Sequence, residues 1–207
     1  NTLLSGSKTP RIAIAGAGAG GVELAMAMRH AFQKRGQNPQ VVLFSAEENL
    51  STEFAGRVSR ALDRRSIDLR SGTRVAAVES GPVVVSRSGR ERFDALFWTA
   101  GAAAPPILKE SGIGCDARGY LRVDATLRSI SHPTLFAAGD AASMEGADLP
   151  KSGVYSVRQG TVLAENLKLA LVGKRLRRYA PQKKSLALIS CGGKYAIASR
   201  GSWSAEG

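Results

Sequence analysis

The residues with the clearest chemical meaning are the glycines at positions 16 to 21. Gly16, Gly18 and Gly21 have the spacing G-x-G-x-x-G, and Gly20 lies between the last two. In a dinucleotide-binding turn, the first glycine of this pattern permits the tight turn, the second lets a pyrophosphate approach the backbone, and the third lets helix and strand pack closely. The free N–H groups at the start of the next helix then attract the phosphates. The pattern predicts a dinucleotide site. A glycine-rich turn used only for packing is the alternative.

The segments around these glycines are those that such a site requires. Residues 11–16 form a short apolar run typical of a buried strand. Residues 20–34 continue as an apolar segment of helical length, with a basic last turn followed by Gly36. Residues 40–44 form the next apolar run and are predicted to be the neighbouring parallel strand. This order predicts a β-α-β unit with the glycines at its first strand–helix junction.

The end of the second strand should select the dinucleotide. Domains specific for NAD carry an acidic residue there, about 20 residues beyond the glycines, to bind the ribose hydroxyls. Here Ser45 occupies that position, with Glu47 and Glu48 just beyond. A serine can hydrogen-bond a 2′-hydroxyl but supplies no charge, and two glutamates would repel a 2′-phosphate. The sequence therefore favours NADH over NADPH.

The following residues continue the α/β pattern. Residues 52–65 have an apolar face at helical spacing and predict a second helix. Short strands are predicted at residues 67–69, 74–78, 83–86 and 93–98, separated by Gly72, residues 80–82 and Gly89. These elements predict a β-α-β-α core with an antiparallel excursion. Its last strand runs from Asp94 and stops at Gly101.

Two later landmarks give the chain a family resemblance. Residues 119–124 read as a short exposed strand, and residues 132–140 lead into a buried strand that ends in Gly139-Asp140. In this order, the glycine motif, the strand that stops at Gly101 and the closing Gly-Asp resemble the two-dinucleotide-domain flavoproteins of the pyridine nucleotide–disulphide oxidoreductase type. The resemblance covers roughly residues 9 to 170.

The resemblance implies roles for individual residues. Asp140 would hydrogen-bond the ribitol of FAD. Glu23 would reach toward the nicotinamide and the flavin, with a carboxylate stabilised by the helix N-terminus as the alternative. Lys151 and Gln159 would begin the helix that closes over the flavin and are candidates for the acceptor-side pocket, although either could equally be surface-exposed. The implied reaction passes a hydride from NAD(P)H to FAD and then reduces an acceptor that the sequence does not identify.

The same resemblance divides the chain. Residues 1–10 are predicted to be a linker or tail, and residues 11–104 a Rossmann-like, three-layer NAD(P)H-binding domain of a parallel sheet plus the antiparallel excursion. Residues 105–173 would be the C-terminal half of an FAD-binding domain, beginning at a proline pair. Residues 174–207 are predicted to be a basic linker and a β-hairpin, with strands at 186–191 and 195–199.

The chain also departs from the family pattern. No second G-x-G-x-x-G precedes Arg11, and no C-x-x-C is present. We therefore expect a fragment of a longer flavoprotein, one that retains no FAD by itself. The tail resembles the oxidoreductase module joined to selenophosphate synthetase, a relative of type II NADH dehydrogenases. The residues that carry this likeness are 150–154, 157–160, 186–190, 195–201 and 203–207. A non-catalytic nucleotide-binding or partner module for selenophosphate synthetase is accordingly the alternative function.

The composition bears on whether the protein binds nucleic acid, a membrane or a metal. The net charge is +12 over 207 residues, but the cations are interleaved with acids and lack interleaved aromatic residues, so specific nucleic-acid binding is not expected. The basic cluster near residues 174–184 could lie weakly on anionic lipid. No apolar run approaches the ~18 residues of a membrane span, which favours a cytoplasmic protein that at most touches the membrane surface. Cys115 and Cys191 are expected to be reduced, and the two histidines form no metal-ligand set.

Overall fold

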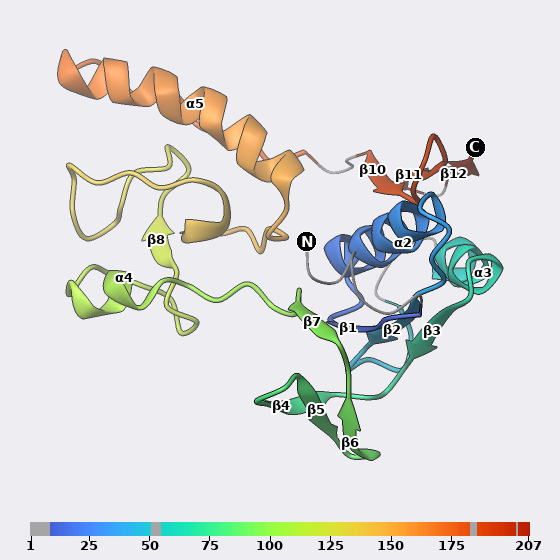
Figure 1. Ribbon diagram of the computed structural model, residues 1–207. Coiled ribbons are helices and arrows are strands. Elements are labelled where there is room, and N and C mark those ends of the chain that lie inside the picture. The colour runs from blue at the N-terminus through green and yellow to red at the C-terminus, as the bar shows by residue number, and fades with distance from the viewer. Residues whose placement is uncertain (1–8, 51–54, 183–185, 202) are drawn as a thin grey trace. The chain divides into compact units, whose positions relative to one another are not determined.

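The structure is a computed structural model that describes residues 9–50, 55–182, 186–201 and 203–207. The chain divides into two units (Figure 1). Unit one comprises residues 1–101 and 184–207, and unit two comprises residues 102–183. No helix in the described ranges is long and apolar enough to cross a membrane.

Unit one contains most of the strands. Its elements are β1 (Arg11–Ala15), α2 (Ala19–Gln33), β2 (Gln40–Phe44), α3 (Ala55–Arg64), β3 (Ile67–Arg70), β4 (Val75–Glu79), β5 (Val83–Ser86), β6 (Gly89–Arg92), β7 (Ala95–Trp98), β10 (Ala187–Ser190), β11 (Ala196–Arg200) and β12 (Trp203–Glu206). Unit two contains α4 (Pro106–Glu110), β8 (Leu121–Val123), a 3-10 turn η1 (Gly139–Ala141), β9 (Ala142–Met144) and α5 (Gly153–Leu171).

A parallel sheet in the order β3-β2-β1-β7 forms the centre of unit one. β1 and β2 are buried on both faces, which explains why they read as continuous apolar runs. Ile12 and Ile14 point to the face that α2 and α3 cover, and Ala13 points to the opposite face. The antiparallel sheet β4-β5-β6 contributes Val84 to that second face. The predicted three-layer, Rossmann-like α/β fold is therefore confirmed.

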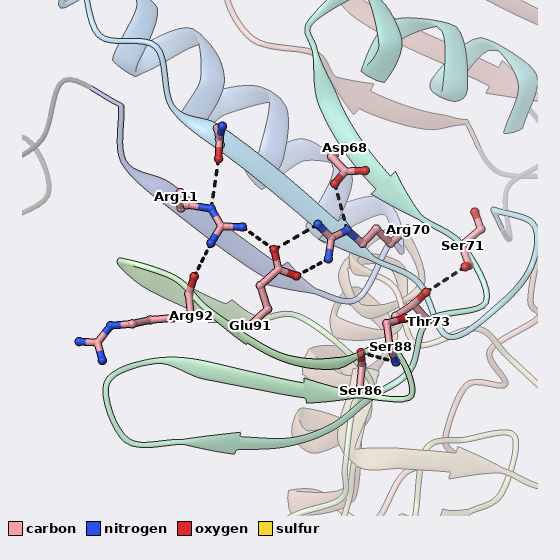
Figure 2. Close-up of polar contacts among 10 residues, drawn as sticks. Arg11, Asp68, Arg70, Ser71, Thr73, Ser86, Ser88, Glu91 and Arg92 are labelled. Carbon is pink, nitrogen blue, oxygen red and sulfur yellow. Dashed lines mark hydrogen bonds and ion pairs between the residues drawn. The ribbon is translucent and has the colours of Figure 1, made fainter.

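A charged network joins the antiparallel sheet to the parallel one (Figure 2). The Glu91 carboxylate on β6 accepts hydrogen bonds from Arg11 of β1 and Arg70 of β3, and Arg70 also pairs with Asp68 at 3.0 Å. The Arg11 guanidinium lies 4.9 Å from the centre of the Phe93 ring. These contacts hold the rim of the antiparallel sheet against two strands of the parallel sheet.

The region between residues 89 and 98 differs from the sequence prediction. The strand expected over residues 93–98 is present as β7, but the sequence missed β6, which begins at Gly89, a residue expected to separate strands. β6 was missed because it is polar and has no apolar alternation. It forms through backbone pairing with β5, in which Val83 lies opposite Arg92.

The C-terminal residues build a sheet on α2. The predicted hairpin is confirmed as β10 and β11, and β12 adds a third antiparallel strand that its polar sequence did not indicate. Ile189 and Ile197 are fully buried in the same core as α2. At Gly192, φ is +81°, and a Cβ there would lie 3.0 Å from the Met26 carbonyl oxygen. Residues 186–207 therefore pack within unit one, whereas the sequence placed them in a separate segment that began at residue 174.

The buried strand expected to end in Gly139-Asp140 is absent, because residues 132–138 form turns and an isolated bridge and are exposed or half-buried. The strand expected to be exposed at residues 119–124 is β8, whose Leu121 and Val123 are buried.

Other element boundaries differ little. The helix expected at residues 20–34 is α2, and the strand expected at 40–44 is β2. The helix predicted for residues 52–65 corresponds to α3, but its first residues lie outside the described ranges.

Unit two is held by a smaller core. Leu121, Val123 and Leu127 are buried there beside Tyr179. The side chain of Asn166 on α5 is fully buried and donates 2.8 Å hydrogen bonds to the carbonyl oxygens of Thr126 and Arg177.

Candidate dinucleotide site

The glycines of the loop between β1 and α2 fall into two groups. Gly16 has φ +111°, and a Cβ there would lie within 2.8 Å of backbone atoms of Thr99 and Ala100. A Cβ on Gly21 would lie 1.8 Å from the carbonyl oxygen of Gly16. These two positions exclude a side chain because the loop, the helix and the end of β7 pack directly against one another.

Gly18 and Gly20, by contrast, border open space. A Cβ on either would meet no atom within 4 Å. Gly18 is the residue before the first turn of α2, and no side chain caps that helix. The open space therefore lies where the first N–H groups of α2 have no intrahelical acceptor. Both features fit a pyrophosphate that approaches the backbone at Gly18.

Thr99 fixes the loop from the neighbouring strand. Its hydroxyl lies 2.9 Å from the carbonyl oxygen of Gly16 and 3.1 Å from that of Ala15, so its one proton can be donated to either. The backbone N–H of Thr99 also donates to Ala15 at 2.8 Å. Sequence reasoning noted only where this strand ends. The polar residue two positions before Gly101 is the signal that could have identified Thr99.

A pocket of about 240 Å³ extends over the ends of these strands. It is lined by residues 15–18, 44–47, 73–75 and 98–101. The structure thus brings Gly16, Gly18, Ser45 and Gly101 to one pocket, and the binding of a dinucleotide there stays a prediction. Two lining residues that the sequence analysis did not assign are Trp98, whose indole N–H donates to Ala100 at 3.0 Å, and Arg74.

The Ser45 hydroxyl is engaged within the protein. Its side chain is 5% exposed, and its hydroxyl donates to the carbonyl oxygen of Glu47 at 2.9 Å and accepts from the Glu47 N–H at 3.2 Å. The hydroxyl therefore stabilises the turn after β2. The exposed Glu47 side chain lies beyond it in the pocket lining.

Glu23 has a backbone partner from the end of the chain. Helix α2 begins at Ala19, so Glu23 lies beyond its first turn, and the suggested stabilisation at the helix N-terminus is not what the structure contains. Instead, its carboxylate accepts a 2.8 Å hydrogen bond from the N–H of Ser190 on β10. Its contact with nicotinamide and flavin stays a prediction.

The Gly-Asp pair lies in unit two, beside α5. Gly139 has φ +65°, and its N–H donates a 2.5 Å hydrogen bond to the Gln159 side chain, which is 4% exposed. Gln159 is therefore not a surface residue but a support of the turn. Asp140 follows on η1, and its exposed side chain makes no hydrogen bond within the described residues. The contact of the Asp140 carboxylate with a ribitol stays a prediction.

Lys151 lies in the same cleft as Asp140. Its ammonium group donates to the carbonyl oxygen of Ala142 and lies 4.1 Å from the centre of the Tyr120 ring. Burial, followed by the charge of Arg118, lowers the pKa of Lys151 below its ordinary value. The side chain is half-buried and engaged in these contacts rather than free on the surface.

The cysteines of the described part of the chain form no disulfide. Cys115 and Cys191 are both free, and burial raises the pKa of the Cys191 thiol. No group of three or more His, Cys, Asp or Glu residues in the described ranges could hold a metal ion.

Comparison with known proteins identifies the family. The family model described as pyridine nucleotide-disulphide oxidoreductase matches residues 1–160. The chain belongs to this family. Its members use FAD and NAD(P)H, and the match confirms the family that the order of motifs indicated.

The curated relatives of this family are longer than the chain. An NADH dehydrogenase-like protein of Mycobacterium tuberculosis is 32% identical over 146 residues, covering 66% of this chain and 36% of its own length. The demethylphylloquinone reductase of a Synechocystis species is 29% identical over 189 residues, covering 86% of this chain and 46% of its own length. The chain therefore spans only about a third to half of these relatives.

Solved structures agree on the fold. The sulfide:quinone oxidoreductase of Aquifex aeolicus superposes with a TM-score of 0.73 at 15% identity, covering 96% of this chain and 54% of the other. A putidaredoxin reductase in covalent complex with putidaredoxin has a TM-score of 0.67 at 17% identity, covering 91% of this chain and 46% of the other.

Proposed function

We propose that unit one binds NAD(P)H, with NADH preferred, and that the whole protein is an FAD-dependent pyridine nucleotide oxidoreductase. The observation that carries the proposal is the open space over Gly18 at the uncapped N-terminus of α2, within a pocket of about 240 Å³. Backbone N–H groups there can bind a pyrophosphate without a charged side chain.

Each part of the pocket has a role in this proposal. Gly16 and Gly21 shape the loop, Gly18 and Gly20 leave room for the phosphates, and Thr99 holds the loop in place. Gly101 lies in the segment after β7 and lines the same pocket. The preference for NADH rests on the carboxylate of Glu47 at the pocket lining, which would repel a 2′-phosphate.

Unit two would supply part of the FAD site. Asp140 would accept hydrogen bonds from the ribitol, and Gln159 would keep the Gly139–Asp140 turn in position. With FAD bound, the cofactors supply hydride transfer from the nicotinamide to the flavin and onward reduction of an acceptor. Glu23 and Lys151 are the ionisable groups that we place toward that reaction.

The binding half of the proposal is tested on the 207-residue chain by titration with NADH. Trp98 lines the pocket, so its fluorescence should be quenched and energy transfer to bound NADH should appear. Calorimetry gives the affinity independently. A chain that binds neither NADH nor NADPH would contradict the site.

The catalytic half needs the longer flavoprotein that we expect to carry this chain. It should oxidise NADH with ferricyanide or a water-soluble quinone, and Asp140→Ala should lower its flavin content. The 207-residue chain, which we expect to be a fragment, should not retain FAD after dialysis. Stoichiometric flavin in the short chain, or full flavin content in Asp140→Ala, would contradict the role given to unit two.

The alternative is a nucleotide-binding partner module of selenophosphate synthetase, without turnover. The tail residues 195–201 and 203–207 favour it by resemblance. Absence of NADH oxidation in the flavin-loaded whole protein, with NADH still bound, would support this alternative instead.

The proposal also includes a cytoplasmic location with weak contact at the membrane surface. Lys174, Arg175, Arg177 and Arg178 are exposed after α5 and would be attracted to anionic lipid. Co-sedimentation with phosphatidylglycerol vesicles, but not with phosphatidylcholine vesicles, is the expected result.

A further inference from the structure

Two side chains of opposite charge line the pocket. Among the described residues that line it, the charged ones are Glu47, after β2, and Arg74, just before β4. Their two segments are joined by backbone hydrogen bonds from Thr73 to Ser45 at 2.7 Å and from Gly72 to Glu47 at 2.9 Å. Both side chains therefore extend from one corner of the pocket, formed by residues 45–47 and 72–74, which these hydrogen bonds hold together.

The corner is further restricted at Gly72. Its φ is +62°, and a Cβ there would lie 2.4 Å from a carboxylate oxygen of Glu48. Glu48 thus packs back against the loop after β3 and is not in the pocket lining. Of the three residues that the sequence offered for ribose recognition, Ser45 is buried and Glu48 is turned aside, which leaves Glu47.

Arg74 is available to a ligand. Its side chain is exposed, and no hydrogen bond or ion pair engages it in the described part of the chain. Most other arginines that contact the parallel sheet are already neutralised or engaged: Arg11 and Arg70 bind Glu91, and Arg29 donates to backbone carbonyl oxygens. Arg74 thus differs from these in having its charge uncompensated.

We propose that Arg74 binds the 2′-phosphate of NADPH, and that Arg74 and Glu47 together set the selectivity between the two dinucleotides. The inference rests on the proposed NAD(P)H site and deepens it. A guanidinium makes strong, charge-assisted hydrogen bonds with phosphate, while a carboxylate repels it. Because the two effects oppose each other at one corner, the pocket accepts both dinucleotides, and the preference for NADH is only about tenfold or less.

The test distinguishes the contribution of the 2′-phosphate to binding from that of the rest of the ligand. We would titrate the 207-residue chain with 5′-ADP and with 2′,5′-ADP, and then with NADH and NADPH, using calorimetry at low and at 0.5 M salt. Arg74→Gln should lower the affinity for 2′,5′-ADP and NADPH about tenfold. It should change the affinity for 5′-ADP and NADH by less than about twofold. Glu47→Gln should raise the affinity for 2′,5′-ADP and NADPH. High salt should reduce both effects because the side chains are exposed.

A matched control removes the same charge elsewhere. Arg60→Gln on α3 changes the net charge equally, at an exposed residue outside the pocket lining, and should leave the ratio of the two affinities unchanged. An unchanged ratio in Arg74→Gln, or an equal shift in Arg60→Gln, would overturn the inference. Failure of the wild-type chain to bind any of the four ligands would instead contradict the proposed function itself.

Discussion

The hydroxyl of Thr99, at the end of β7, lies 2.9 Å from the carbonyl oxygen of Gly16 in the loop that precedes α2. The two residues are separated by 83 positions in the sequence. The contact matters because Gly16 has φ +111°, a conformation that its neighbours must hold in place. A side chain outside the glycine motif therefore positions the motif.

Replacement of Thr99 should weaken dinucleotide binding through this contact. Thr99→Val keeps the shape but removes the donated hydrogen bond, worth about 1 kcal/mol, so we expect NADH affinity to fall about fivefold. Thr99→Ser keeps the hydroxyl and should bind NADH as the wild type does. Calorimetry on the three proteins gives the comparison, and equal affinities of the valine and serine variants would contradict the role of Thr99.

Replacement of Gly18 should block the pyrophosphate without harming the fold. Apart from its chain neighbours, no residue has an atom within 4 Å of a Cβ at Gly18, so we expect the fold to accommodate Gly18→Val. We expect an unchanged melting temperature and at least a tenfold loss of NADH affinity. Gly160→Val on α5, where a Cβ also meets nothing within 4 Å, is the control and should bind NADH normally. Equal NADH affinities of Gly18→Val and the wild type would place the site elsewhere.

The hydrogen bond from Ser190 to Glu23 should stabilise unit one. The Ser190 N–H points toward α2, whereas the next N–H, of Cys191, donates to Tyr195 in the sheet. Proline is tolerated on an edge strand where the N–H faces away from the ladder, so Ser190→Pro removes only the bond to Glu23. We expect it to lower the free energy of unfolding by about 1–2 kcal/mol in urea titrations.

A double-variant cycle makes this prediction specific. In a Glu23→Ala background, Ser190→Pro should cost nothing further, because the acceptor is already gone. Additive losses from the two changes would show that proline acts on the strand rather than on this hydrogen bond.

The Glu91 network should give a stability that depends on pH. Hydrogen bonds from Arg70, and then Arg11, lower the pKa of Glu91 below its ordinary value. A carboxylate with a lowered pKa in the folded protein stabilises it above the unfolded-state value near 4.5, and this stabilisation is lost as the pH falls through the folded-state pKa. Glu91→Gln should therefore cost about 1 kcal/mol at pH 7 and progressively less below pH 4.5.

Glu79 provides the control for this titration. It pairs with Arg90 in the same antiparallel sheet, but the two side chains are 40% and 67% exposed. Glu79→Gln should change the free energy of unfolding little at pH 7 or below pH 4.5, since exposed ion pairs contribute little to stability. A pH-independent loss in Glu91→Gln would show that shape rather than charge is responsible.

The sequence alone determined the features that depend on local residues. Gly16, Gly18 and Gly21 predicted the loop because close packing excludes a side chain at Gly16 and Gly21, while a ligand needs the open space at Gly18. The apolar runs predicted β1 and β2 because strands buried on both faces are apolar throughout. The order of the motifs was sufficient to indicate the family.

The tertiary structure decided which partners these residues have. From the sequence, Ser45 should contact a ribose, but the turn after β2 uses its hydroxyl. Glu23 has its partner 167 residues away, on β10, and β6 forms only because β5 offers a free edge. Such contacts join distant parts of the chain, and their energies depend on burial and register that no local pattern contains. The loop could therefore be predicted from the sequence, whereas the residues that support it and select its ligand could be found only in the folded chain.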